Sequence, residues 1–177
     1  TGKTPPTDNK EFYNGDVPFI CIDDIRGNTN IVDTKIKITK KGADFQKNKY
    51  LEKDTLAVTC IASPGLLGFT TKLSQTNQQI NSIQFKKKEN SYYLYHYLSD
   101  YFKFAKAKKG NILSNMNKGE FSSIKIIKPK DDVINNFYEK LVPSMEKIKN
   151  FEIQNNKLKK LVNTLIPLTI TGQLSPK

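Results

Sequence analysis

A seven-residue apolar repeat in the last third of the chain constrains the fold more than any other feature. Two polar residues, Ser144 and Asn155, interrupt the repeat; its apolar members are Ile134, Phe137, Leu141, Ile148, Phe151, Leu158, Val162 and Leu165. The residues that flank this stripe are mostly Lys, Glu and Asn, so only one narrow face would be apolar. Such a stripe favours pairing with another helix, in which a core Asn can fix the register. The sequence therefore predicts one long amphipathic helix over residues 131–166, roughly 50 Å in length.

Prolines and acidic residues mark the ends of this predicted helix. Pro129 precedes it, and Asp131 and Asp132 can cap its first N–H groups while their charge favours the positive end of the helix. We expect Pro167 to end the helix and Pro143 to kink it or divide it in two, because proline removes a backbone hydrogen bond. The periodicity leaves one alternative open, in which the stripe packs against the rest of the chain as ordinary core.

Positive charge is concentrated before the helix. The 177 residues carry a formal net charge of +12. Residues 1–130 contain 22 Lys or Arg and 12 Asp or Glu, whereas residues 131–177 contain 7 and 5. We therefore expect a head over residues 1–130 whose surface could bind a polyanion such as nucleic acid, then the helix, then a tail over residues 167–177. All basic residues except Arg26 are Lys, which a bias toward AT-rich codons would also produce.

Apolar runs and turn residues predict a mixed α/β fold for the head. We expect strands over residues 17–25, 55–62, 83–85 and 121–127, a short helix opening at residues 39–42, and a longer helix over residues 91–109. Gly65 and Gly68 enclose Leu66 and Leu67 in the loop after the second strand. Their spacing does not match a phosphate-binding loop, so a tight turn is the plain interpretation, and the two leucines could contact another protein.

Few residues suggest catalysis, metal binding or a membrane. Cys21 and Cys60 have no Cys-x-x-Cys context and are expected to be buried free thiols, and His96, among tyrosines, to be structural. The chain has no Asn/Asp-Pro-Pro-Tyr/Phe motif of an adenine methyltransferase and no Glu-x-Lys motif of a nuclease; Asp8 and Asp33 begin Asp-x-Lys triplets in apparent surface loops. Neither a membrane-spanning run nor a signal peptide is visible, so we expect a cytoplasmic location.

A series of short motifs, in a fixed order, covers almost the whole chain. They are Gly2-Lys3-Thr4-Pro5, Gly15-Asp16-Val17-Pro18-Phe19-Ile20, Ile38-Thr39-x-x-Gly42, Asp54-Thr55-Leu56 leading to Gly65 and Gly68, Asn77-Gln78-Gln79, residues 124–129, and Leu165-Ile166-Pro167 before Thr171-Gly172-Gln173-Leu174. In this order they resemble one half of a specificity subunit of a type I restriction-modification system, with one target recognition domain and one conserved spacer helix.

The resemblance implies an α+β fold: a mixed α/β target recognition domain that contacts duplex DNA, followed by a long helix that forms an antiparallel coiled coil with a second copy. It implies no catalytic role and no bound cofactor. Partner subunits would modify DNA with S-adenosylmethionine or cleave it with ATP and Mg²⁺. Such subunits normally carry two heads and two helices, so this chain is either a piece of a larger subunit or a natural half-subunit. A half-subunit would form a homodimer and prefer an inverted-repeat target.

The resemblance also suggests roles for individual residues. We expect base edges to be contacted from loops, by Ser63, Thr70, Thr71, Gln78, Gln79, Asn111, Asn115 and Asn117. Phosphate groups would be neutralised by Lys3, Arg26, Lys72, Lys106, Lys108 and Lys109. The apolar repeat, with Asn155, would pair the helices. Two alternatives stay open: a coiled-coil adaptor whose basic head reads no sequence, and a recognition module of another restriction-modification class.

Overall fold

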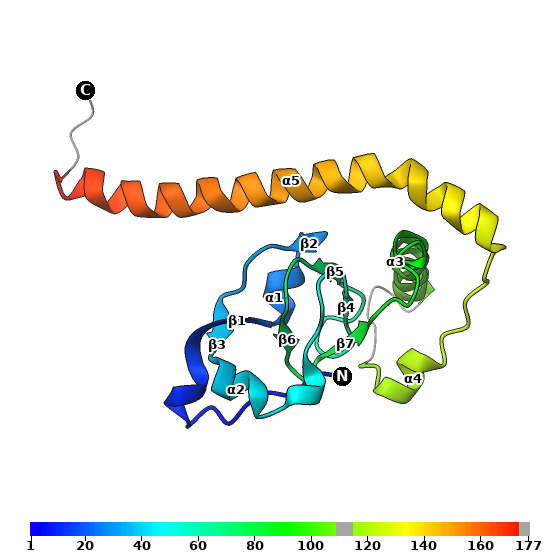
Figure 1. Ribbon diagram of the computed structural model, residues 1–177, viewed down its shortest axis with the longest axis horizontal. Coiled ribbons are helices and arrows are strands. Elements are labelled where there is room, and N and C mark those ends of the chain that lie inside the picture. The colour runs from blue at the N-terminus through cyan, green and yellow to red at the C-terminus, as the bar shows by residue number, and fades with distance from the viewer. Residues whose placement is uncertain (109–114, 174–177) are drawn as a thin grey trace.

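Two small β-sheets form the centre of the head in the computed structural model, which describes residues 1–108 and 115–173 (Figure 1). The first sheet has the order β3-β1-β6, with β1 at Tyr13–Ile20, β3 at Ile36–Ile38 and β6 at Gln75–Thr76. The second has the order β2-β5-β4-β7, with β2 at Asn30–Ile31, β5 at Leu67–Thr70, β4 at Leu56–Thr59 and β7 at Ile80–Ile83. Antiparallel pairs dominate, while β6 is parallel to β1 and β2 is parallel to β5.

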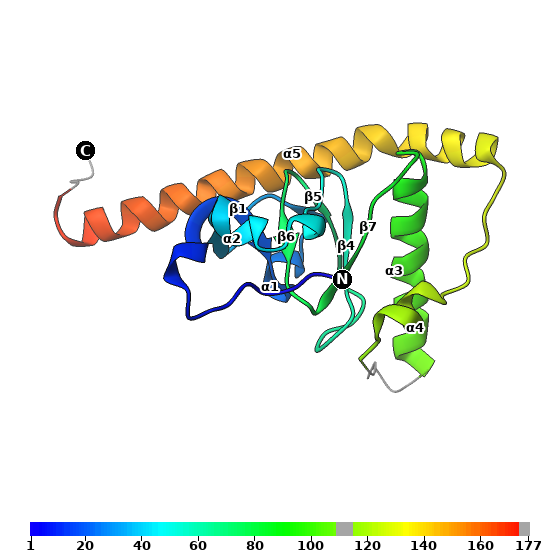
Figure 2. The same cartoon turned by 60° about the horizontal axis from the view of Figure 1, so that its bottom comes forward.

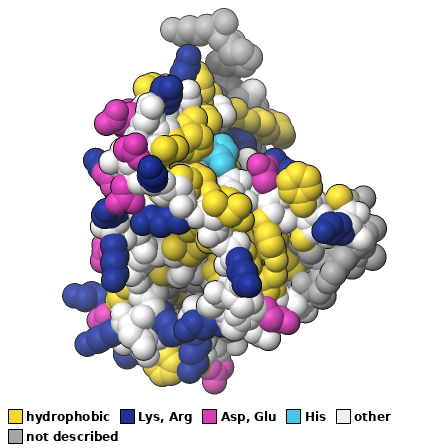
Figure 3. All heavy atoms as spheres, turned by 90° about the vertical axis from the view of Figure 1, so that its right-hand side faces the viewer, with side chains coloured by type: hydrophobic (Ala, Val, Ile, Leu, Met, Phe, Trp, Pro, Cys, Tyr) yellow, Lys and Arg dark blue, Asp and Glu magenta, His cyan; other side chains and the backbone are white. Residues whose placement is uncertain are grey.

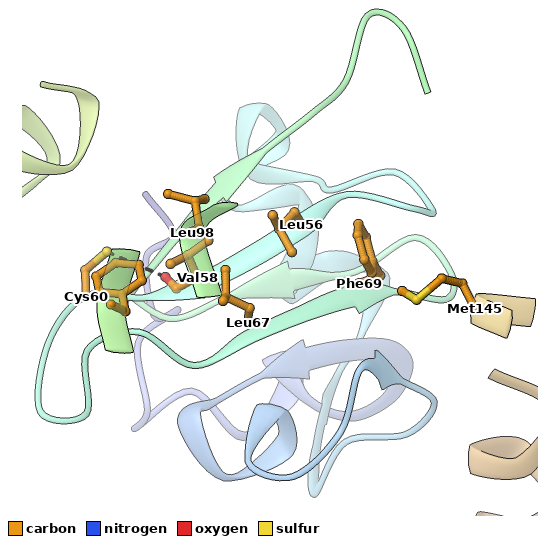
Figure 4. Packing of buried hydrophobic residues seen from close by; sticks show 8 residues of the cluster. Leu56, Val58, Cys60, Leu67, Phe69, Leu98 and Met145 are labelled. Carbon is orange, nitrogen blue, oxygen red and sulfur yellow. Dashed lines mark hydrogen bonds between the residues drawn. The ribbon is translucent and has the colours of Figure 1, made fainter. Parts of the chain in front are cut away.

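Strand β4 is buried throughout because both of its faces are covered. Leu56 and Val58 point to one face, where they pack against Leu98 and Phe102 of helix α3 (Asn90–Lys108). Ala57 points to the other face and packs in a second cluster with Ile20, Ile25, Ile31 and Ile80. This alternation is the period-2 geometry of a strand, and burial on both faces removes the need for polar residues. Figure 4 shows the first cluster, with Met145 reaching Phe69 from the C-terminal helix.

Short helices begin where side chains can satisfy free N–H groups. Thr39 caps α2 (Lys40–Asp44) by accepting a 3.1 Å hydrogen bond from the Gly42 N–H, as the sequence predicts. Asn117 and Glu120 form a reciprocal capping box at the start of α4 (Lys118–Ser122). Two 3-10 turns, η1 (Lys10–Phe12) and η2 (Lys47–Lys49), and the single turn α1 (Ile22–Ile25) complete the helical segments of the head.

The long helix α5 (Asp131–Ile170) is one continuous element. Neither Pro143 nor Pro167 ends it, although the first turns are inclined to the axis of the remainder in Figure 1. The prediction of one long helix is confirmed, but its expected end at residue 166 is wrong, so the helix extends into the predicted tail. From its start beside α3, the helix runs back across the whole head.

The mixed α/β head and long C-terminal helix confirm the predicted fold class, while all four predicted strands need correction. The strand expected at residues 83–85 lies earlier, because β7 ends at Ile83. The chain leaves β1 at Ile20 because Asp24 Oδ2 accepts a 2.8 Å hydrogen bond from the Cys21 N–H and turns residues 22–25 into α1. Strand β4 ends at Thr59 because the chain turns into the loop of residues 60–66. Residues 121–127 are not a strand: the capping box starts α4, and extended chain follows, with Ile127 exposed.

Candidate nucleic-acid interface

Several of the predicted DNA-contacting residues lie at one end of β4. We call this surface the loop face and define it as Arg26 and residues 60–66, 77–79 and 115–118. Backbone hydrogen bonds connect its segments, because the Cys60 N–H donates to Gln79 O at 2.9 Å and the Met116 N–H donates to Cys60 O at 2.8 Å. In Figure 2 the loop between β4 and β5 lies at the lower edge of the head, and α5 crosses the upper edge. The loop face is therefore on the side of the head away from α5.

The loop of residues 60–66 is held in a defined conformation. Thr59 is fully buried, and its Oγ1 accepts a 2.9 Å hydrogen bond from the Leu66 N–H while donating to Ser63 O. Ala62 has a φ of +65°, which is unfavourable for a residue with a Cβ, and Asn115 Oδ1 fixes it by accepting a 2.9 Å hydrogen bond from its N–H. Backbone strain that the surroundings impose in this way is found preferentially at functional sites.

Gly65 connects this loop to the end of α3. Its φ is +91°, and a Cβ added to it would lie 2.6 Å from Cγ of Phe102. Only glycine combines this conformation with such close packing. The tight-turn interpretation of Gly65 is therefore correct, and the turn places the loop against Phe102 of α3, one helical turn before Lys106.

The loop face brings together five of the residues that we expected to contact bases. Gln78 is exposed, and its Oε1 accepts a 2.7 Å hydrogen bond from the Thr4 hydroxyl. The half-buried Gln79 is held by Asn77, whose Nδ2 donates to Gln79 Oε1 at 3.0 Å. Asn115 and Asn117 are exposed, but one side-chain oxygen of each is used by backbone N–H groups. Ser63 accepts a 3.4 Å hydrogen bond from Arg26.

Other predicted base contacts lie elsewhere. The prediction for Thr70 is wrong, because its side chain is fully buried in β5, donates to Glu52 O and accepts from the Thr55 N–H. Thr71 donates to Ile31 O at 2.8 Å, at the opposite end of β5 from the loop face. Lys72 follows it in the same turn and is likewise distant from the loop face. Asn111 and Lys109 lie outside the described residues.

Leu66, at the end of the 60–66 loop, and Leu67, at the start of β5, do not form an exposed patch. Leu67 is only 9% exposed and belongs to the core cluster under α3. Leu66 packs against the second cluster. The expectation that both leucines contact another protein is therefore wrong for Leu67, and Leu66 is partly used by the core.

The predicted phosphate contacts surround the loop face unevenly. Arg26 is exposed and lies on the loop face, but Asp23 is 3.8 Å away and offsets part of its charge. The Lys3 ammonium lies 5.8 Å from the centre of the Phe45 ring, on a neighbouring side of the head. Lys106 and Lys108 lie on the last turns of α3, and Phe121 of α4 packs against the core cluster that contains Phe102 of α3. Sequence reasoning missed Lys118, which is exposed immediately after Asn117; its position beside a capping Asn is the signal that could have identified it.

A family comparison decides what kind of domain carries this face. Residues 1–163 match the model of the type I restriction modification DNA specificity domain. The chain belongs to this family. The family resemblance predicted from the ordered motifs is thus confirmed, and it extends over both the head and most of α5.

Individual relatives agree with this assignment. The specificity subunit of the type I restriction enzyme HindI from Haemophilus influenzae is 38% identical over 177 residues, covering 98% of this chain and 39% of that protein. The crystal structure of the HsdS subunit from Thermoanaerobacter tengcongensis gives a TM-score of 0.56 at 14% identity, over 98% of this chain and 42% of that one. A chain from a study of complex assembly and conformational transition in the type I R-M system gives a TM-score of 0.59 at 13% identity, over 93% of this chain and 40% of that one. This specificity domain therefore spans about two fifths of the length of the relatives it matches.

The apolar repeat of the specificity domain is divided between two environments. Ile134 is 2% exposed and packs on the head, so its predicted role in helix pairing is wrong, and Leu141 is partly buried against the core cluster. Phe137 contacts the rings of Tyr93 and His96. The remaining apolar members project into solvent, at 39–58% exposure: Ile148, Phe151, Leu158, Val162 and Leu165. Asn155 is also exposed. The described residues offer these later positions no apolar partner.

The two cysteines and the single histidine of the specificity domain are partly or fully buried or packed against aromatic rings. Cys60 is buried and Cys21 partly buried, and burial is the main cause that raises the pKa of each thiol. Residues 1–108 and 115–173 contain no group of three or more His, Cys, Asp or Glu side chains that could hold a metal ion. His96 packs its ring edge-on against Tyr95 and Phe137, and Figure 3 shows this histidine in cyan beside hydrophobic side chains. No helix within the same ranges is long and apolar enough to cross a membrane.

Proposed function

We propose that this chain recognises the base sequence of double-stranded DNA as a specificity module of a type I restriction-modification complex. The observation that carries the proposal is the loop face of a chain that belongs to this family. Its exposed amide side chains stand on loops whose backbone is held by hydrogen bonds, and lysines follow at the end of α3. The chain would then supply one head and one spacer helix of an assembly that contacts a split target.

Two kinds of contact would divide the work. Amide side chains can form paired hydrogen bonds with the N6 and N7 groups of adenine in the major groove, and the exposed Gln78 is the candidate on the loop face whose amide oxygen is not used by a backbone N–H group. Lysines at the end of α3 and at residue 118 would neutralise phosphates and add affinity without sequence information. Fixed loop conformation supports discrimination, because donors and acceptors that cannot move cannot adapt to a wrong base.

The later part of α5 would pair with a second spacer helix. Its apolar side chains recur regularly in the sequence but are exposed, and this pattern supports burial of these side chains against a partner helix. That helix could belong to the second half of a longer subunit or to a second copy of this chain. In the second case a two-fold dimer would prefer an inverted-repeat target.

Catalysis would belong to partner subunits. We propose that modification subunits bind S-adenosylmethionine and that restriction subunits bind ATP and Mg²⁺, whereas this chain binds no cofactor and directs them to a site. A cytoplasmic location, where the DNA and these partners are found, goes with the proposal.

Selection from a randomised duplex library tests this function. The chain is incubated with random-sequence duplexes, bound DNA is recovered over several rounds, and affinities of enriched and random duplexes are compared from low to physiological salt. We expect a short enriched sequence and a specificity ratio that persists as salt weakens all binding. Equal affinity for all duplexes at every salt concentration would contradict the proposal and favour an adaptor with a basic head.

A further inference from the structure

Polar contacts hold the middle of α5 on the head after its apolar contacts have ended. The apolar contacts with the core cluster are confined to the first turns, up to Met145. Beyond it, Lys149 Nζ lies 3.5 Å from Asp54 Oδ1, and Lys160 pairs with Asp33. Between these two ion pairs lies Glu152, whose carboxylate makes the most extensive contact of the three.

Glu152 accepts three hydrogen bonds from the edge of the second sheet. Its Oε1 accepts from the Thr29 N–H at 2.6 Å, and its Oε2 accepts from the Asn30 N–H at 3.0 Å and from Asn30 Nδ2 at 2.7 Å. β2 is an edge strand, so without Glu152 these two successive N–H groups would lack a partner in the sheet. Hydrogen bonds to a carboxylate are shorter and stronger than those between neutral groups.

The acceptor site is itself rigid. Asn30 is only 7% exposed, and the Phe69 N–H donates to Thr29 O at 2.8 Å, which ties this segment to the central strands. Residues 145 and 152 are separated by about two helical turns, so the apolar contact at Met145 and the carboxylate contact at Glu152 define a line along α5. Two separated fixed points determine the direction of a rod, whereas one point leaves it free to swing.

We propose that Glu152 is a positioning residue that fixes the angle between the head and α5, and thereby the distance at which two paired heads can contact DNA. The first part rests on the geometry alone, and the second part rests on the proposed function. Glu152 would contact no base or phosphate of the DNA. Its effect would therefore be on the relative placement of the two half-sites and not on the recognition of either half-site.

A distance measurement tests the angle without DNA. Spin labels are attached to cysteines introduced at the exposed Asn48 on the head and Lys159 on α5, in a Cys21→Ser background, and labelled chain is diluted with unlabelled chain. We expect a narrow distance distribution that becomes clearly broader in Glu152→Gln, because the amide places a donor where an N–H already points. Glu139→Gln, at an exposed carboxylate of the same helix with no ion pair among the described residues, should leave the distribution narrow.

A spacing profile tests the consequence for DNA. Duplexes carry two copies of the selected half-site separated by spacers of different length, and binding of the parent chain, Glu152→Gln and Glu139→Gln is compared. We expect Glu152→Gln to retain single half-site affinity but to lose on the order of tenfold in preference for the best spacer, comparable to losing one charged hydrogen bond.

The two measurements separate the possible failures. A distribution that stays narrow in Glu152→Gln, or broadens equally in Glu139→Gln, overturns the positioning role. A broadened distribution with an unchanged spacing preference overturns its effect on DNA. If the parent chain itself shows no sequence preference, the proposed function fails, and the distance distributions still decide whether Glu152 fixes the helix.

Discussion

Replacing Met145 by alanine separates the docking of α5 from the pairing of α5. The Met145 side chain is 6% exposed and packs in the cluster with Phe69, so the change removes buried atoms and leaves a gap. Core Met→Ala changes cost about 2–5 kcal/mol, and a value near 2 kcal/mol is reasonable where a helix can settle onto the gap. With a urea m-value of about 2 kcal/mol/M, the midpoint of unfolding should fall by roughly 1 M.

Ile148→Ala is the matched control, because it removes a similar volume three residues later on the same helix. Ile148 is 40% exposed, so its replacement should change the free energy of unfolding by less than about 0.5 kcal/mol. Urea unfolding followed by circular dichroism at low protein concentration, where helix pairing contributes least, measures both variants. A larger loss for Ile148→Ala, or equal losses, would refute the observed orientation and restore the alternative in which the repeat itself packs on the head.

Three further predictions concern DNA binding, pH and helix pairing. Lys106→Ala should weaken binding to all duplexes alike and reduce by about 1 the slope of log affinity against log salt concentration. Gln78→Ala should lower the binding free energy by about 1–3 kcal/mol for the selected sequence only. Equal losses on selected and random duplexes for both variants would contradict these roles. For Asp33, partial burial would raise the pKa, but hydrogen bonds from Lys160 and the Thr34 N–H and the charge of Lys37 outweigh it and lower the pKa to about 2. Because the folded-state pKa lies below the ordinary carboxyl value of 3.8, the stabilisation is complete above that value and is lost as pH falls toward 2. With an allowance for solvent screening at the exposed Lys160, Asp33→Asn should lower the free energy of unfolding by about 1 kcal/mol at pH 6 and by much less at pH 2.5, as measured by urea unfolding. A loss that does not depend on pH would argue against the ion pair. Finally, three exposed positions of the repeat are replaced by Asn together: Ile148, Phe151 and Leu158. If these positions pair the helices, sedimentation should show that the paired species becomes a monomer. A paired species of unchanged mass would mean that other residues form the helix–helix contact.

Local signals in the sequence predicted those parts of the fold that short-range chemistry determines. Thr39 before Gly42 predicted the start of α2, the helical spacing of apolar residues predicted α3, and the seven-residue repeat predicted α5. The strand expected at residues 121–127 was wrong because an apolar run alone cannot show whether a partner strand exists, and Asn117 and Glu120 had already started a helix. Proline also misled: Pro143 and Pro167 both lie inside α5, so each removes one backbone hydrogen bond without ending the helix.

The candidate site was predictable as a set of loops but not as a surface. Ser63, Gln78 and Asn115 are far apart in the sequence. The pairing of β4 with β5 and β7 brings the first two loops to one end of the head, and the hydrogen bond from the Met116 N–H to Cys60 O adds the third. The same pairing places Thr71 and Lys72 at the opposite end, and turns Thr70 inward to satisfy backbone groups. Glu152 gave no signal at all, because its partners are backbone N–H groups more than 120 residues away.

Helical geometry explains why the apolar repeat of α5 supported two interpretations at once. A straight helix has 3.6 residues per turn, so positions seven residues apart drift by about 20° per heptad around its axis. Ile134 starts the repeat facing the head, and Val162, four heptads later, is rotated by about 80° from it and is exposed. The residues that face the head follow the 3.6-residue period of the helix and not the 3.5-residue spacing of the repeat; they include Met145, Lys149 and Glu152. The face of α5 that docks on the head and the stripe of the apolar repeat therefore coincide at the start of the helix and separate along it, which would leave the later positions open to the proposed partner helix while the head stays docked.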